Sequence, residues 1–162
     1  MKLKGKEKHF WKTHFNISNL EAIPLEMSHY TGIDSEEDDE FLFYLTSRVQ
    51  TIHKINLRCT RITDEGVNYI SNLKNLKELK LKNHVHITKK CLPNLNKLIS
   101  LEYLDISKNC IEIEDLIVLS NLQNLKELHI SSDESQEYIS KKIKLLQAML
   151  SSCIIYVNYE KQ

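Results

Sequence analysis

An apolar skeleton of six residues recurs along the chain at a nearly constant interval. Copies begin at Ile52, Leu76, Leu101 and Leu125, so successive starts lie 24, 25 and 24 residues apart. Each copy has apolar residues at its first, fourth and sixth positions. One unit of this size cannot bury its own apolar side, but stacked neighbours can bury each other's. The period therefore predicts a stacked array and not a closed globule around one pocket.

Each unit contains two kinds of apolar spacing. The alternation at the end of the skeleton is typical of a short strand with one buried face. After polar turn residues, a second apolar stretch follows at helical spacing. In the first unit that stretch comprises Val67, Ile70 and Leu73. In the third unit it comprises Leu116, Leu119 and Leu122. The unit is thus predicted to be strand, turn and helix.

The skeleton resembles that of the leucine-rich repeat family from Ile52 to about Ile130. Residues 57–59 and the segment Ile62–Val67 are similar to the I-T-D-x-G-[LV] region of the cysteine-containing and ribonuclease-inhibitor-like subtypes. The next copy keeps Ile87 and Thr88 but then departs from the pattern. The resemblance implies an α/β solenoid with about six short parallel strands on a concave face, helices on the convex face and a helical N-terminal cap.

The family places an asparagine in the turn after each strand, where it can satisfy backbone groups of a neighbouring coil. Only one copy of the skeleton, with Asn109, has this residue. The corresponding positions hold Thr60, His84 and Asp133. We therefore expect an irregular ladder between coils.

Weaker copies extend the array at both ends. Leu20-x-x-Ile23-x-Leu25 fits the skeleton upstream, although its step to the next copy is 32 residues. Downstream, 145–157 reads as a helix feeding a last strand with Ile155 and Val157 inward. We expect one domain over 1–162, with a cap at 1–19, repeats at 20–144 and a closing helix and strand at 145–162. Aromatic residues of the cap are expected to cover the first coil, namely Phe10, Trp11 and Phe15.

Charge and hydropathy exclude several classes of partner. The chain has 22 basic and 22 acidic residues, whereas general nucleic-acid and membrane-surface binders carry a basic excess. It has no run of 18 apolar residues, and its basic N-terminus lacks the apolar stretch of a secretory signal. The sequence predicts a cytoplasmic protein that is monomeric when free and binds neither nucleic acid nor membrane.

The sequence offers little for catalysis or metal binding. No nucleophile elbow, phosphate-binding glycine loop or paired-histidine zinc motif occurs, so we expect no enzyme activity, no cofactor and no metal. His84 and His86 could supply two metal ligands, but the preferred interpretation places His84 in a turn and His86 in solvent. The cysteines are expected to be reduced thiols in or near the core, with a disulfide framework or a zinc site as the alternatives. They are Cys59, Cys91, Cys110 and Cys153.

An acidic run spans 34–40 and permits two interpretations. It can be a helix start with Ser35 as the cap, because negative charge stabilises the first turn of a helix. It can also attract a basic partner or a cation. The first is preferred, since an apolar stripe beginning at Phe41 follows at once.

The alternation of the strands predicts which residues face solvent, and these outward residues define the concave face. The earlier coils place basic residues there, and the later coils place acidic and aromatic ones. This division of charge favours a partner whose surface carries the opposite division. Tyrosine and arginine are frequent anchors of protein interfaces. We expect the centre at His129, flanked by Tyr103 and Tyr156. The full predicted partner-binding set is Arg58, Lys80, Lys82, Tyr103, Asp105, Glu127, His129 and Tyr156.

These observations favour a non-enzymatic protein-binding module. A narrower hypothesis is a cytosolic inhibitor, such as an immunity or antitoxin protein that blocks a toxic enzyme through the concave face. The alternative is an adaptor or substrate-receptor subunit of a ubiquitin-ligase-like complex. An ordinary solvated sheet, with the partner at 34–40, is the remaining possibility.

Overall fold

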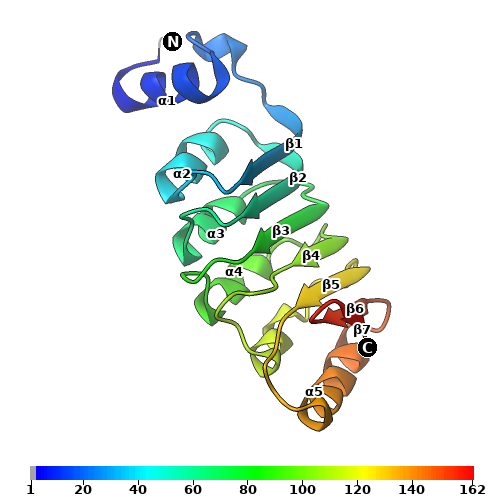
Figure 1. The fold of residues 1–162 in the computed structure, drawn as a ribbon. Helices are drawn as coiled ribbons and strands as arrows, with labels where there is room; N and C mark the ends of the chain where they lie inside the picture. The colour runs from blue at the N-terminus through cyan, green and yellow to red at the C-terminus, as the bar shows by residue number, and fades with distance from the viewer. Residues whose placement is uncertain (1–2) are drawn as a thin grey trace.

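The computed structural model describes residues 3–162, which form a column of stacked coils (Figure 1). Its strands form one seven-stranded sheet in which every strand lies beside its neighbours in chain order. Figure 1 shows the strands along one side of the column and the helices along the other. The strands are β1 (Glu26–Ile33), β2 (Thr51–Arg58), β3 (Glu78–Lys82), β4 (Tyr103–Asp105), β5 (Glu127–Ile130), β6 (Ile154–Val157) and β7 (Glu160–Lys161). The helices are α1 (Gly5–Phe15), η1 (Leu20–Ala22), α2 (Asp39–Thr46), α3 (Asp64–Ile70), η2 (Lys89–Cys91), α4 (Leu92–Leu95), η3 (Ile113–Leu119) and α5 (Gln136–Met149), where η marks a 3₁₀ helix.

The predicted register of the central strands is confirmed. β1 to β6 run parallel, and the pairing aligns Leu79 with Leu104 and Leu104 with Leu128. These three leucines are fully buried, because the inward side of every strand meets the helices of its own and neighbouring coils. The apolar residues of successive coils thus share one continuous core.

The first strand differs from the prediction. Leu20–Ala22 is a 3₁₀ turn and Leu25 is exposed, so the apparent upstream skeleton is not a strand. The strand is β1, in which Met27 pairs with Ile52 and Gly32 pairs with Leu57. The step from Met27 to Ile52 is 25 residues, and the regular period therefore holds at this end of the array.

The two ends of the array are closed differently. At the N-terminus, α1 buries Phe10 and Trp11, and the ring of Phe10 contacts that of Phe41 from α2 at 5.1 Å. At the C-terminus, α5 begins at Gln136, so the expected boundary after residue 144 falls inside this helix. The short strand β7, which the sequence analysis missed, pairs antiparallel with β6.

Polar ladders join successive coils at the start of their helices. The Asp39 carboxylate accepts hydrogen bonds from the backbone N–H and hydroxyl of Thr63, at 2.9 and 2.7 Å. Asp64 accepts the same pair from Thr88, both at 2.7 Å. Thr63 also accepts from the Glu65 backbone N–H at 3.2 Å, so the segment Thr63–Asp64 caps α3 and joins it to the coils on both sides. Among residues 3–162, no helix is long and apolar enough to cross a bilayer.

Candidate protein-binding face

Strand pairing sets the outward residues of the sheet in columns, as predicted. The first column runs through Lys54, Glu78, Tyr103, Glu127 and Ile154. The second runs through Asn56, Lys80, Asp105, His129 and Tyr156. These side chains lie on the side of the sheet away from the buried leucines, because successive side chains of a strand alternate. The concave face thus brings the predicted residues of β2 to β6 onto one surface.

An aromatic stack forms the centre of this face. The imidazole of His129 lies parallel to the ring of Tyr156, with ring centroids 4.4 Å apart and planes 5° apart. On its other side it meets Tyr103, with centroids 5.0 Å apart at 31°. All three side chains are half-buried. The stack holds their rings in place before any partner arrives, so binding would cost little side-chain entropy.

A lysine extends the stack toward the earlier coils. The Lys80 ammonium lies 5.0 Å from the centroid of the Tyr103 ring, within the range of a cation–π contact. Burial raises the pKa of Tyr103 to about 12, with a smaller contribution from nearby carboxylates that include Asp105. Its hydroxyl therefore stays protonated and available as a donor near neutral pH.

Asp105 does not fit the predicted role. Its side chain is buried, and its carboxylate accepts hydrogen bonds from the Ser107 backbone N–H at 3.0 Å and the Ser107 hydroxyl at 2.6 Å. The carboxylate therefore stabilises the turn after β4 and offers a partner little surface. Glu127 remains half-exposed, with one oxygen 3.3 Å from Nε2 of His129.

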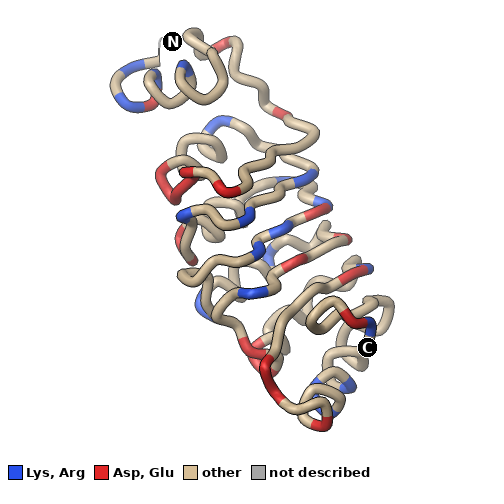
Figure 2. Tube along the Cα trace, viewed as in Figure 1, with Lys and Arg blue, Asp and Glu red and all other residues tan. Residues whose placement is uncertain are grey.

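The basic side of the expected charge split is partly neutralised within the chain. Arg58 lies 3.4 Å from the carboxylate of Asp34, and Lys54 donates to Glu78 at 2.6 Å. Figure 2 shows basic and acidic positions interleaved along the strand side of the column. The later aromatic coils are therefore a more distinctive feature of the face than its charge.

Tyr159 is a member of the face that the sequence analysis missed. The Lys82 ammonium lies 4.6 Å from the centroid of its ring. Tyr159 and Asn158 form the two-residue turn between β6 and β7, with φ values of 72° and 51°. This is the geometry of a type I′ turn, in which the second position favours glycine. The only signal in the sequence was Asn158, a common turn residue.

The acidic run is a helix start, as preferred, but its cap is Asp38 and not Ser35. Asp38 accepts a hydrogen bond from the Phe41 backbone N–H at 2.9 Å. Glu37 accepts from the Tyr30 hydroxyl at 2.7 Å, which helps fix the loop against β1. Much of the charge in this segment thus has a role inside the chain.

The histidine pair and the cysteines also have defined places. His84 is buried, and its Nε2 lies 3.3 Å from the Thr60 backbone N–H, whereas His86 is exposed. Asn109 accepts from the His84 backbone N–H at 2.8 Å and donates to the Leu81 carbonyl at 2.6 Å, so the irregular ladder forms. Cys91 and Cys153 are buried and Cys59 is half-buried, but Cys110 is exposed, contrary to the expectation for all four.

Comparison with known proteins finds the repeat of one family twice in this chain. Models of the leucine-rich repeat family match residues 50–71, which carry β2 and α3, and residues 97–120, which carry β4 and η3. Among solved structures, an internalin from Listeria monocytogenes is similar at 18% identity and a TM-score of 0.42, over 87% of this chain and 49% of the internalin chain. The chain thus spans about half the length of that internalin. No curated protein matches the sequence. The repeated skeleton, the stacked coils and the matches at two repeats together support a leucine-rich repeat protein.

Proposed function

We propose that this chain is a non-enzymatic protein-binding module that holds one partner protein on its concave face. The narrower form of the proposal is inhibition: the chain acts as a monomer in the cytoplasm and blocks an enzyme, in the manner of an immunity or antitoxin protein. Leucine-rich repeat domains in general mediate binding between proteins. Stacked repeats present broad surfaces suited to that task.

The observation that carries the proposal is the stack of Tyr103, His129 and Tyr156 on the solvent side of the sheet. Aromatic residues in the middle of a surface often supply most of the binding energy of an interface. Here they come from three adjacent strands, and Lys80 and Lys82 approach the rings of Tyr103 and Tyr159. The face therefore offers both apolar area and hydrogen-bonding groups.

Inhibition is supported by the rigidity of this surface. Each stacked side chain projects from a strand whose opposite side packs into the continuous core. A rigid surface can cover a site on an enzyme without rearranging, which favours slow dissociation. An adaptor would need a second surface engaged at the same time, and this distinguishes the two hypotheses by experiment.

An affinity capture from the native lysate tests the proposal. The wild-type chain, a Tyr103→Ala/Tyr156→Ala variant and a Tyr69→Ala variant would be immobilised in parallel, and retained proteins identified by mass spectrometry. Tyr69 lies on α3, on the helical side of the column, and serves as the matched control. We expect one protein retained by the wild type and by the control but not by the double variant.

The stoichiometry and the partner's activity decide the narrower form. Sedimentation of the purified complex should give one chain of each protein, and adding the chain should abolish the partner's activity. Two different proteins held together would favour an adaptor. Retention by the double variant as strong as by wild type would reject the concave face as the binding surface.

A further inference from the structure

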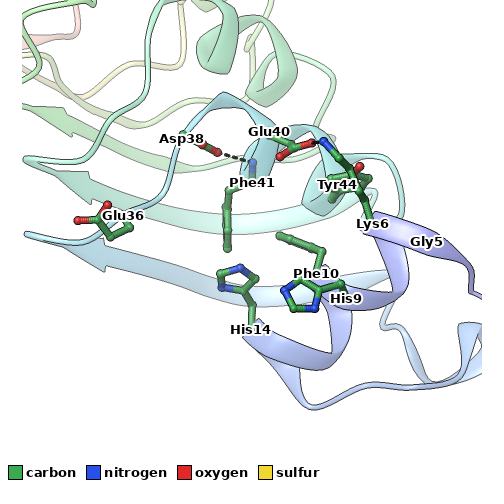
Figure 3. A pocket seen from close by; sticks show the side chains of 10 residues that line it. All are labelled: Gly5, Lys6, His9, Phe10, His14, Glu36, Asp38, Glu40, Phe41 and Tyr44. Carbon is green, nitrogen blue, oxygen red and sulfur yellow. Dashed lines mark hydrogen bonds and ion pairs between the residues drawn. The ribbon is translucent and has the colours of Figure 1, made fainter.

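A pocket lies away from the concave face, between α1 and α2 (Figure 3). Its volume is about 510 Å³, which falls within the range of pockets that hold small ligands or single side chains. Figure 3 shows the rings of Phe10 and Phe41 facing the space between the two helices, with His9 and His14 beside them on α1. The pocket therefore lies between the N-terminal cap and the first coil.

The floor of the pocket is aromatic and fixed. Phe10 and Phe41 are buried, with their ring centroids 5.1 Å apart, and Tyr44 lies 5.3 Å from Phe10. His14 meets Phe41 edge to face at 5.0 Å. Aromatic ring faces attract cations, and they stack well against the planar guanidinium of arginine.

The rim of the pocket is acidic. Glu36, Asp38 and Glu40 line it. Glu36 is paired with Arg61 and Asp38 caps α2, so Glu40 is the carboxylate that a new cation can reach. Lys6 lies 3.0 Å from the carboxylate of Glu40, and both side chains are more than half exposed. An ion pair so exposed to solvent contributes little stability, so another cation can displace the lysine at low cost.

We propose that this pocket binds an arginine side chain presented by a partner protein, with its guanidinium over the aromatic floor and paired with Glu40. In the free chain, the ammonium of Lys6 occupies the position of that guanidinium at the rim. Arginine is favoured over lysine because it can stack on the rings and pair with a carboxylate at once. The chain therefore carries a second recognition site, and the chemistry of this site differs from that of the concave face.

Titration with a blocked amino acid tests the proposal directly. Nα-acetyl-arginine methylamide would be added to the full chain, and backbone amide shifts followed by NMR. The matched probe is Nα-acetyl-citrulline methylamide, which has the same shape without the charge. We expect saturable shifts confined to α1 and residues 34–44 with arginine, and binding weaker by about tenfold with citrulline. Equal binding of the two probes, shifts that never saturate, or shifts on the concave face would overturn the proposal.

Two variants of the ion pair should change the affinity in opposite directions. Glu40→Gln removes the carboxylate that pairs with the guanidinium and should weaken arginine binding by about fivefold or more. Lys6→Gln removes the competing ammonium and should strengthen it. If both variants have the same effect, Lys6 does not compete for the site and the assignment is wrong.

The test is independent of the concave face. The Tyr103→Ala/Tyr156→Ala variant should bind the arginine probe with the affinity of the wild type, because those residues belong to β4 and β6 and do not line the pocket. A loss of arginine binding in that variant would place the site on the concave face and reject the pocket. Failure of the concave-face proposal would leave this result unchanged.

Discussion

The carboxylate of Asp64 accepts hydrogen bonds from both the backbone N–H and the hydroxyl of Thr88, 24 residues further along the chain. Asp64→Ala removes both bonds and leaves the Thr88 N–H without its acceptor. We expect the free energy of unfolding to fall by about 1–3 kcal/mol, measured by urea denaturation. Glu65→Ala, an exposed neighbour in the same helix, should change it by less than about 0.5 kcal/mol. Equal losses in the two variants would show that the inter-coil bonds contribute nothing.

Gly66 is explained by close packing rather than by an unusual backbone angle. A Cβ atom at this position would lie 2.5 Å from Oδ1 of Asp39 and 2.9 Å from Cδ1 of Leu42. Gly66→Ala should therefore destabilise the fold by about 1–3 kcal/mol, even though alanine favours helix formation over glycine by about 1 kcal/mol. Thermal denaturation against the wild type measures the net effect, and a stabilised variant would contradict the packing argument.

The sequence predicted the central coils well because their skeleton residues are leucine and isoleucine at a fixed period. The same reasoning failed at the first coil, where the inward positions are Met27, Tyr30 and Gly32. A Cβ atom at Gly32 would lie 2.7 Å from the Glu37 carboxylate, so a larger residue there would have to displace that side chain. The apolar residues at 20–25 matched the skeleton better than β1 does, by chance. Only the pairing of β1 with β2 shows which segment is the strand.

His84 occupies the ladder position of the family's asparagine and gives the fold a dependence on pH. Its Nε2 accepts the Thr60 N–H only when the ring is neutral, and burial lowers the pKa of His84 below the ordinary 6.5. The unfolded chain therefore binds a proton more readily than the folded chain as pH falls below 6.5. Stability should decline there by at most about 1.4 kcal/mol per pH unit, until the pH passes the folded pKa.

The matched variant for this prediction is His84→Asn, which restores the family's residue and cannot titrate. Urea midpoints at pH 7.5 and 5.5 would be compared for the two proteins, so that the other histidines contribute equally. The wild type should lose more stability than the variant between the two pH values. The same loss in both would mean that the buried imidazole takes up its proton freely in the folded chain.

For the candidate site, the sequence could predict which residues share a face of the sheet but not the contacts that their side chains make. Alternation and period were enough to place Tyr103, His129 and Tyr156 on one surface, because they depend on strand register alone. They could not show that Asp105 turns back to Ser107, since that depends on the local path of the chain after β4. Nor could they place Tyr159, which reaches Lys82 only because of the hairpin that β7 forms with β6.

Tyr159 lies in a backbone conformation that a bulky side chain adopts at a cost of about 1 kcal/mol or more. Tyr159→Gly relieves this strain and should therefore raise the free energy of unfolding by roughly 1 kcal/mol. If the concave face binds the partner as proposed, the same variant should weaken binding. Chemical denaturation and calorimetry measure the two effects, and a variant that binds as tightly as wild type would exclude Tyr159 from the interface.

Removing a tyrosine of the stack on the concave face should weaken binding more than it weakens folding. Tyr103→Ala and Tyr156→Ala should each reduce the binding free energy by about 1–3 kcal/mol, because each removes a preorganised ring from the centre of the surface. Their effect on the free energy of unfolding should be smaller, about 0.2–1 kcal/mol, since cross-strand pairs on a solvated face contribute little to stability. Because His129 lies between the two tyrosines, the double variant should cost less binding energy than the two single losses together. Additive losses would show that the two tyrosines contact the partner independently and that the stack is not the unit of recognition.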